Sequence, residues 1–141
     1  MIDATDILSA RILVVDDDPD SAQVLAQTLA LNGYTGVTVT CDSRVVPELH
    51  RRNDYDLILL DMHMPCMDGL EVMEGLKESE RDGYLPVLAL TAEPGHRMLA
   101  LQRGARDFLR KPVDPDELLL RVRNQVEVRL LYKERALPVR A

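Results

Sequence analysis

Short apolar runs recur along the chain, separated by stretches with the spacing of amphipathic helices. Most of these runs do not alternate apolar with polar residues, so both faces of the strands that they form should be buried. We therefore predict an α/β fold in which a parallel sheet is covered by helices on both sides. The runs cover residues 12–15, 37–39, 57–60, 86–90 and, more weakly, 107–109.

Helix start and stop signals lie between the runs. Residues 18–19 are an aspartate and a proline, which suit an N-cap and the first helical position, and residues 32–33 are an Asn-Gly stop signal. Pro47 lies inside the second predicted helix, residues 44–52, and must stand in its first turn or delay its start. The last helical pattern runs from residue 116 to about residue 134. The sequence thus predicts five strand–helix pairs.

Length and charge exclude several classes of protein. The 141 residues suit one domain, and 17 basic residues against 24 acidic ones give a net charge of −7. A chain with this charge lacks the basic face that a phosphate backbone requires, so we expect no direct contact with nucleic acid. We also expect no membrane span and a cytoplasmic location. Cys41 and Cys66 have no partner at metal-ligand spacing and are expected to be free thiols.

A polar residue follows four of the five runs, at the point where each predicted strand ends. The carboxyl ends of parallel strands share one edge of a sheet, so these side chains should converge. Crowded carboxylates repel by about 4 kcal/mol per pair at about 4 Å, which calls for a cation, and oxygen ligands favour Mg²⁺. A lysine and a hydroxyl opposite the metal would then hold a phosphoryl group. The residues are Asp16, Asp17, Asp18, Asp61, Thr91 and Lys111.

Four motifs resemble, in order and spacing, the signatures of the receiver domain of two-component response regulators, in particular the chemotaxis receivers. They lie at residues 14–19, 61–69, 90–92 and 111–112. The resemblance covers residues 10–127 and implies a flavodoxin-like (βα)5 fold, doubly wound, with a five-stranded parallel sheet in the order 2-1-3-4-5. Residues 1–9 are then an N-terminal extension. Residues 128–141 continue the last helix, as a connector to an output domain or as a dimer contact.

The resemblance implies a phosphoacceptor and a metal site. Asp61 would take a phosphoryl group from a sensor histidine kinase or a phosphotransfer protein. Asp16, Asp17 and Asp61 would bind Mg²⁺, together with the backbone carbonyl of His63. Residues two positions past the nucleophile and two past Thr91 tune dephosphorylation in this family, which assigns that role to His63 and Glu93 here.

The remaining implied roles concern the phosphoryl oxygens and the switch. Lys111, the Thr91 hydroxyl and the Ala92 N–H would bind the phosphoryl group, and Thr91 and Phe108 would act as switch residues. Phe108 stands where chemotaxis receivers have tyrosine, so a switching ring at this position has no hydroxyl to hydrogen-bond.

The expected function is a phosphorylation-controlled switch that acts on an output domain C-terminal to this chain or on a separate effector. Its only catalysis would be its own phosphorylation and dephosphorylation. The alternative of a stand-alone or degenerate receiver acting as an interaction adaptor stays open. A haloacid-dehalogenase-like phosphohydrolase is less favoured, because it needs a second aspartate where this chain has His63.

Apolar residues lie on more than one face of the predicted last helix. Residues 119, 122, 126 and 130 form a stripe that can pack on the sheet, whereas Leu120, Val128 and Leu131 lie largely off that stripe. The second set suggests a homodimer contact, and the alternative is a long solvated helix whose scattered apolar residues have no partner. Charged residues of the segment, Arg129 and Lys133 among them, are expected to keep it soluble.

Overall fold

The computed structural model describes residues 2–63, 69–79 and 84–136. Cys66, predicted to be a free thiol, and the rest of residues 64–68 lie outside the described residues, whereas Cys41 is a free and exposed thiol. None of the helices in the described ranges is long and apolar enough to cross a bilayer.

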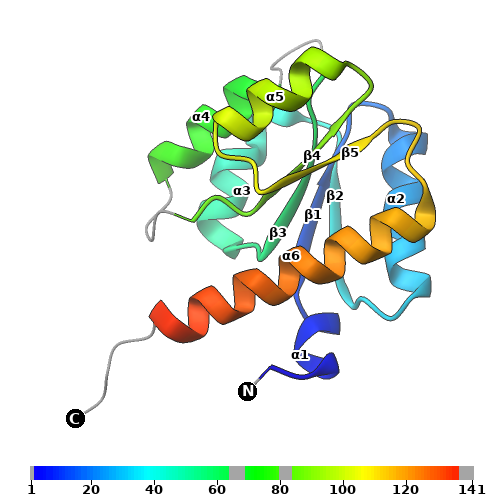
Figure 1. The fold of residues 1–141 in the computed structure, drawn as a ribbon, viewed down its shortest axis with the longest axis vertical. Coiled ribbons are helices and arrows are strands. Elements are labelled where there is room, and N and C mark those ends of the chain that lie inside the picture. Colours follow the sequence, from blue (N-terminus) through cyan, green and yellow to red (C-terminus); the bar gives the residue numbers. More distant parts are fainter. Residues whose placement is uncertain (1, 64–68, 80–83, 137–141) are drawn as a thin grey trace.

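The five strands form one parallel sheet in the order β2-β1-β3-β4-β5, which confirms the predicted topology (Figure 1). Their register places Val15 beside Leu60 and Thr91 beside Arg110, so the carboxyl ends of neighbouring strands meet at one edge. The strands are β1 (Arg11–Val15), β2 (Gly36–Thr40), β3 (Leu57–Asp61), β4 (Val87–Thr91) and β5 (Asp107–Arg110).

Helices cover both faces of the sheet, with α2 and α6 on one face and α3, α4 and α5 on the other (Figure 1). Asp18 caps α2 by accepting a hydrogen bond from the Asp20 N–H, and Pro47 stands in the first turn of α3, as predicted. Gly33 and Gly104 follow α2 and α5 with φ of +97° and +110°, which glycine adopts without strain. The helices are α1 (Ala4–Leu8), α2 (Pro19–Leu31), the 3-10 turn η1 (Ser43–Val45), α3 (Val46–Asn53), α4 (Gly69–Ser79), α5 (Pro94–Gln102) and α6 (Pro115–Ala136).

Alternate residues of the central strands belong to two apolar layers, one on each face of the sheet. In β3, for example, Leu57 and Leu59 face the layer that contains α2 and α6, whereas Ile58 and Leu60 face the layer that contains α3, α4 and α5. All of them are buried, which confirms the reading of the unbroken apolar runs. The edge strand β2 is only partly buried.

Residues 1–9 were predicted only as an extension, but they include a short helix that joins the core. The Asp3 carboxylate accepts from the Asp6 N–H, and the Asp6 carboxylate accepts from the Asp3 N–H, which is a capping box. Ile7 is buried in the layer that α2 and α6 form on the sheet.

The last helix, α6, begins and ends close to the predicted residues, and its exposed apolar set is as predicted. Leu120, Val128 and Leu131 are 58%, 48% and 46% exposed. The expectation that Arg129 is solvated is wrong, because its side chain is 1% exposed. It follows Val122 and Val126 on the buried face and lies 3.5 Å from the Asp54 carboxylate, in the segment that leads into β3.

Candidate functional site

Three aspartates meet at the carboxyl edge of the sheet. Asp16 follows β1 and Asp61 ends β3, and because these strands are neighbours their buried carboxylates lie close together. Asp17 is exposed, yet one oxygen from each of the three carboxylates lies within 4.8 Å of the others. The loop is held by backbone contacts: the Asp18 N–H donates to Asp16 Oδ1 at 3.0 Å, and the Asp16 N–H donates to the Thr40 carbonyl at 3.3 Å.

Lys111 reaches this cluster from the end of β5. Its Nζ lies 3.2 Å from Asp16 Oδ2 and 3.3 Å from Asp61 Oδ2, so one ammonium bridges two carboxylates. The Lys111 N–H donates to the Thr91 carbonyl, which extends the β4–β5 pairing, and the Lys111–Pro112 peptide is cis. Among the described residues the cluster therefore holds three carboxylates against one ammonium and carries excess negative charge.

Burial and charge act on the acid–base properties of the cluster. Burial raises the pKa of Asp61 above its ordinary value, and neither the His63 N–H that donates to Asp61 Oδ1 at 3.1 Å nor the Lys111 charge cancels this effect. Burial by itself would lower the pKa of Lys111, but the carboxylates of Asp61 and Asp16 outweigh it and raise that pKa. Lys111 is therefore protonated at neutral pH, whereas the charged form of Asp61 is disfavoured in the folded protein.

The donor set fits a hard divalent cation. Three carboxylate oxygens within 4.8 Å of one another, with no nitrogen or sulfur in the group, suit Mg²⁺, which takes a few carboxylates and keeps several waters. His63 is exposed at the rim of the cluster. A cation there would neutralise charge that Lys111 alone does not.

Thr91 and the two residues after it form the turn between β4 and α5. Thr91 is buried, and its Oγ1 accepts from the Glu93 N–H at 3.0 Å and donates to the Glu93 carbonyl at 3.2 Å. The hydroxyl thus stabilises the turn ahead of α5, where Glu93 is the N-cap residue. Ala92 and Glu93 are both exposed. The expected approach of the hydroxyl to a phosphoryl group would therefore replace the bond to the Glu93 carbonyl.

Phe108 lies on β5 beside this turn and is partly buried. The guanidinium carbon of Arg97, from α5, is 4.9 Å from the centroid of the Phe108 ring, a cation–π distance. A cavity of about 150 Å³ lies between Thr91, Phe108 and the two arginines 97 and 110. Nothing in the sequence spacing singled out Arg97, because its contact is with a residue on another element.

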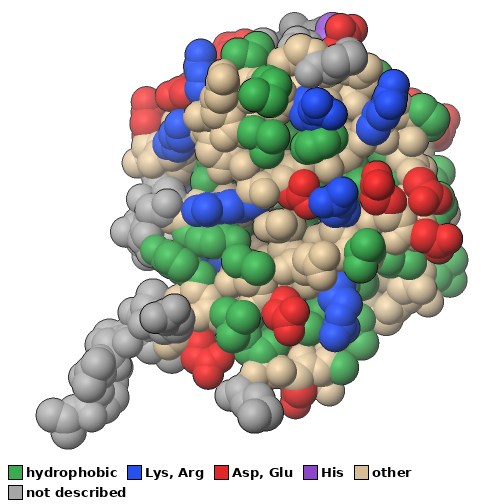
Figure 2. Space-filling view, in the orientation of Figure 1, with side chains coloured by type: hydrophobic (Ala, Val, Ile, Leu, Met, Phe, Trp, Pro, Cys, Tyr) green, Lys and Arg blue, Asp and Glu red, His purple; other side chains and the backbone are tan. Residues whose placement is uncertain are grey.

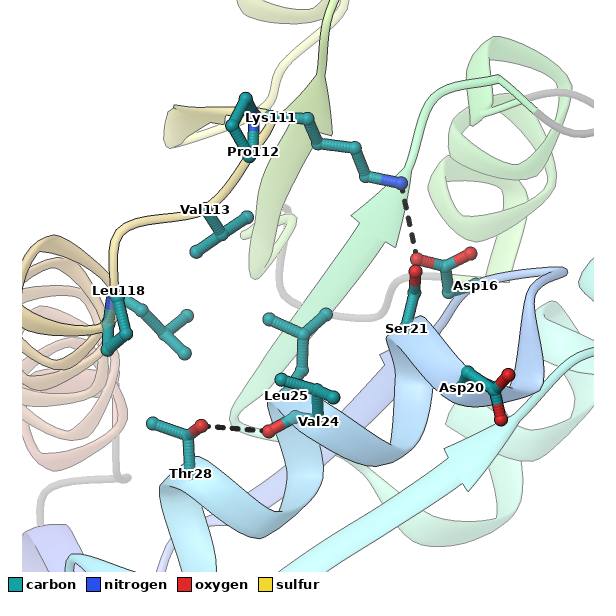
Figure 3. Close-up of a pocket in the computed structure, with 11 residues that line it drawn as sticks. Asp16, Asp20, Ser21, Val24, Leu25, Thr28, Lys111, Pro112, Val113 and Leu118 are labelled. Carbon is teal, nitrogen blue, oxygen red and sulfur yellow. Dashed lines mark hydrogen bonds and ion pairs between the residues drawn. The ribbon is translucent and has the colours of Figure 1, made fainter.

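A larger cavity, of about 340 Å³, opens between α2 and the loop that leads into α6 (Figure 3). Asp16 and Lys111 form its polar end, and the ion pair between them is drawn in the figure. Leu25 and Leu118 line its apolar end, together with Val24, which is 62% exposed. This cavity joins an apolar surface directly to the charged cluster, and no pattern in the sequence indicates it.

Comparison with known proteins gives a consistent set of relatives. Residues 12–123 match the family model described as "Response regulator receiver domain". The chain is 38% identical over 129 residues to "Response regulator PleD" of Caulobacter vibrioides and 42% identical over 118 residues to "Response regulator MprA" of Mycobacterium ulcerans. These alignments cover 90% and 82% of the chain but 28% and 50% of the relatives, so the chain spans at most about half their length.

Solved structures show the same architecture. One is the receiver domain of a sensor histidine kinase from Pseudomonas aeruginosa, with a magnesium ion coordinated in its active site cleft. It is 31% identical to this chain, with a TM-score of 0.76, and the match covers 84% of this chain and 98% of that one.

Proposed function

The chain belongs to the receiver domain family of two-component response regulators, and we propose that it accepts a phosphoryl group on Asp61. The observation that carries the proposal is the placement of the Asp61 carboxylate between two further carboxylates and the Lys111 ammonium at the carboxyl edge of the sheet. This arrangement supplies a nucleophile, a cation site and a fixed positive charge within one small volume.

The donor in this proposal is a phosphohistidine of a sensor histidine kinase or of a phosphotransfer protein. An Asp61 carboxylate oxygen attacks phosphorus and the P–N bond breaks. The histidine leaves as a neutral imidazole that keeps the proton already on its other ring nitrogen, and an acyl phosphate forms on Asp61. The Lys111 Nζ, which lies 3.3 Å from Asp61 Oδ2, then binds the negatively charged phosphoryl oxygens. Water later attacks the phosphorus and restores the carboxylate and free phosphate.

Mg²⁺, when bound by Asp16, Asp17, Asp61 and the His63 carbonyl, would stabilise the charge on the phosphoryl oxygens. The receiver structure that contains magnesium in its cleft supports this assignment. For the chain itself, the same carboxylates position Lys111, because two of them bind its ammonium.

Thr91, Ala92 and Phe108 would connect the acyl phosphate to the surface. The Thr91 hydroxyl exchanges the Glu93 carbonyl, 3.2 Å away, for a phosphoryl oxygen, and the Ala92 N–H binds another. This exchange loosens the turn before α5 and frees space beside Phe108, where the cavity of about 150 Å³ can accept the ring. The switch then acts through burial of the ring, since phenylalanine has no hydroxyl.

His63 and Glu93 are both exposed at the rim of the site and would tune the lifetime of the acyl phosphate by binding the attacking water. Replacing His63 with alanine should change the decay rate without abolishing phosphorylation. An unaltered decay rate would remove His63 from the path of the water.

The test of the phosphoacceptor uses acetyl phosphate with Mg²⁺ and intact-protein mass spectrometry. The wild type should gain one phosphoryl mass, and Asp61→Asn or omission of Mg²⁺ should give none. Asp56→Asn is a matched control, because Asp56 is similarly buried beside the opposite end of the same strand. Labelling that persists in Asp61→Asn, or that is lost in a folded Asp56→Asn, would contradict the assignment.

The cavity beside α2 supports a docking site for the phosphodonor protein. Its apolar end, with Val24 exposed, leads to Asp16 and Lys111, so a helix of the donor that covers Val24 would place its phosphohistidine near Asp61. Val24→Glu should slow transfer from a phosphorylated histidine phosphotransfer domain but not from acetyl phosphate. Leu31→Glu, on the same helix but outside the cavity, is the control. Equal effects of the two substitutions would oppose this docking site.

The exposed apolar residues of α6 support a contact with a second copy of the chain. The face that carries α6 shows hydrophobic side chains among charged ones (Figure 2), and the exposed set is Leu120, Val128 and Leu131. Leu131→Glu should weaken a dimer measured by analytical ultracentrifugation with phosphodonor present. A wild type that stays monomeric with and without phosphodonor would contradict this contact. The output would be a domain that follows this chain, as the greater length of its relatives suggests, or a separate effector.

A further inference from the structure

A second charged cluster lies at the amino edge of the sheet, opposite the phosphoacceptor site. Arg129 Nη2 lies 3.5 Å from Asp54 Oδ1, and Lys133 Nζ lies 3.3 Å from Asp54 Oδ2 and 2.7 Å from Asp56 Oδ1. Both cations come from the last turns of α6, and both carboxylates come from the segment between α3 and β3. We call these four residues the base clamp.

The carboxylates of the base clamp are fixed by the backbone. Asp56 Oδ2 accepts from the Arg11 N–H at 3.0 Å, and the Asp56 N–H donates to the Arg11 carbonyl at 2.8 Å, so Asp56 extends the pairing of β1 with β3. Asp54 closes α3 in the left-handed conformation, with φ of +49°. The Asp56 side chain is 8% exposed, and its other oxygen, Oδ1, faces Lys133 on α6.

Aromatic packing completes the contact between α6 and the body of the domain. The Tyr84 ring has the Arg129 guanidinium carbon 5.0 Å and the Arg106 guanidinium carbon 4.0 Å from its centroid. The Tyr132 ring, from α6, lies 4.8 Å from Tyr84 between centroids. Arg129 is consequently 1% exposed, which is rare for arginine and indicates a built contact.

We infer that the end of α6 is docked on the amino edge of the sheet through the base clamp, so that the folded receiver continues to about residue 134. Within the base clamp two carboxylates meet two cations, so the four side chains balance one another in charge. Residues 128–134 are therefore an integral arm of the domain rather than a free connector. The arm fixes where the chain leaves the domain relative to β3, the strand that carries Asp61. The inference concerns the unphosphorylated protein and does not rest on the proposed phosphorylation of Asp61.

The test is amide hydrogen exchange on the full chain, read by mass spectrometry. Amides of residues 129–134 should exchange as slowly as those of residues 118–126 in the wild type. Lys133→Met should speed exchange at residues 129–134 by about tenfold or more and leave residues 118–126 unchanged, because a partly buried ion pair is lost locally. Arg123→Met, an exposed substitution on the same helix, should change neither segment.

Two results would overturn the inference. One is exchange of residues 129–134 near the rate of an unstructured peptide in the wild type, which needs no variant to be observed. The other is a Lys133→Met protein whose exchange matches that of Arg123→Met in both segments.

Discussion

The two edges of the sheet carry charged clusters made from the same kinds of side chain but with different balance. The carboxyl edge holds three aspartates, 16, 17 and 61, against Lys111. The amino edge holds two aspartates, 54 and 56, against Arg129 and Lys133. Among the described residues, the first cluster therefore carries excess negative charge, whereas the four charges of the second cluster balance one another.

This difference in charge balance distinguishes a cluster that is built to bind a ligand from one that stabilises the fold. A cluster with unmatched carboxylates costs free energy in the absence of a cation, and it is retained where a ligand supplies the missing charge. A cluster with matched charges and aromatic cover holds the elements that carry it together. Removal of a carboxylate should therefore have opposite effects on stability at the two edges.

The largest expected effect is at the paired edge. Asp56→Ala should lower the free energy of unfolding by about 2 kcal/mol, because the Arg11 N–H and the Lys133 ammonium lose their acceptor. Asp61→Asn should instead raise it at pH 7 without metal, because the raised pKa means that the folded state disfavours the ionised carboxylate. Urea unfolding in EDTA measures both. A similar loss in the two variants would end the distinction between the edges.

Metal should act on one edge alone. Mg²⁺ at about ten times its Kd should stabilise the wild type by about 1.4 kcal/mol, or a few degrees in Tm. Asp17→Asn should lose most of this gain, since Asp17 belongs to the carboxylate group, whereas Asp54→Asn should keep it. Thermal unfolding with and without Mg²⁺ gives the comparison, and an equal gain in both variants would place the metal elsewhere.

The two lysines should respond differently to the same metal. Lys111→Ala should cost about 1 kcal/mol in EDTA, because Asp16 and Asp61 then face each other uncompensated, and Mg²⁺ should restore the loss. Lys133→Met should cost a similar amount that Mg²⁺ does not restore. Urea unfolding of both variants at two Mg²⁺ concentrations tests this, and a Lys111→Ala loss that persists in Mg²⁺ would mean that the lysine is mainly structural.

The smallest effect concerns alkaline pH at the paired edge. Burial raises the pKa of Tyr84 above the ordinary 10.0, although the nearby Arg106 and Arg129 lower it in part. The neutral ring thus adds stability that is complete below about pH 10 and declines as pH rises through the folded-state pKa. Tyr84→Phe should flatten this part of the decline, as measured by unfolding at pH values from about 9 to 11. Parallel pH profiles for the two proteins would exclude this contribution.

The sequence predicts the sheet and the meeting of the site residues because both follow from local pattern. Unbroken apolar runs identify buried parallel strands, and a polar residue at each strand end places Asp61 and Lys111 at the same edge. The direction of the Thr91 hydroxyl and the cavities could not be predicted, since they depend on packing between elements. The five-residue α1 is too short for periodicity, and its one local signal is the pair Asp3 and Asp6.

The base clamp is the clearest case of a feature that sequence reasoning missed. Charged helix residues are usually solvated, so the sequence alone predicts an exposed Arg129. The helical spacing indicates a buried Arg129 instead, because residues 122, 126, 129 and 133 form a single stripe on α6. This stripe starts with two buried valines and ends with the two cations of the base clamp. Two aspartates immediately before a buried strand are the matching signal, but only the fold brings the two segments together.

The long helix α6 is held in place near both of its ends. Its 22 residues span about 33 Å, from the loop after Lys111 to the base clamp. A tilt of about 5° about its first turn would move the backbone at Lys133 by about 2 Å, close to the 2.7 Å that separates Lys133 Nζ from Asp56 Oδ1. A tilting helix therefore has to disturb the ion pairs at its far end, whereas a rotation of the turn before α5 has to break the local bond between the Thr91 hydroxyl and the Glu93 carbonyl.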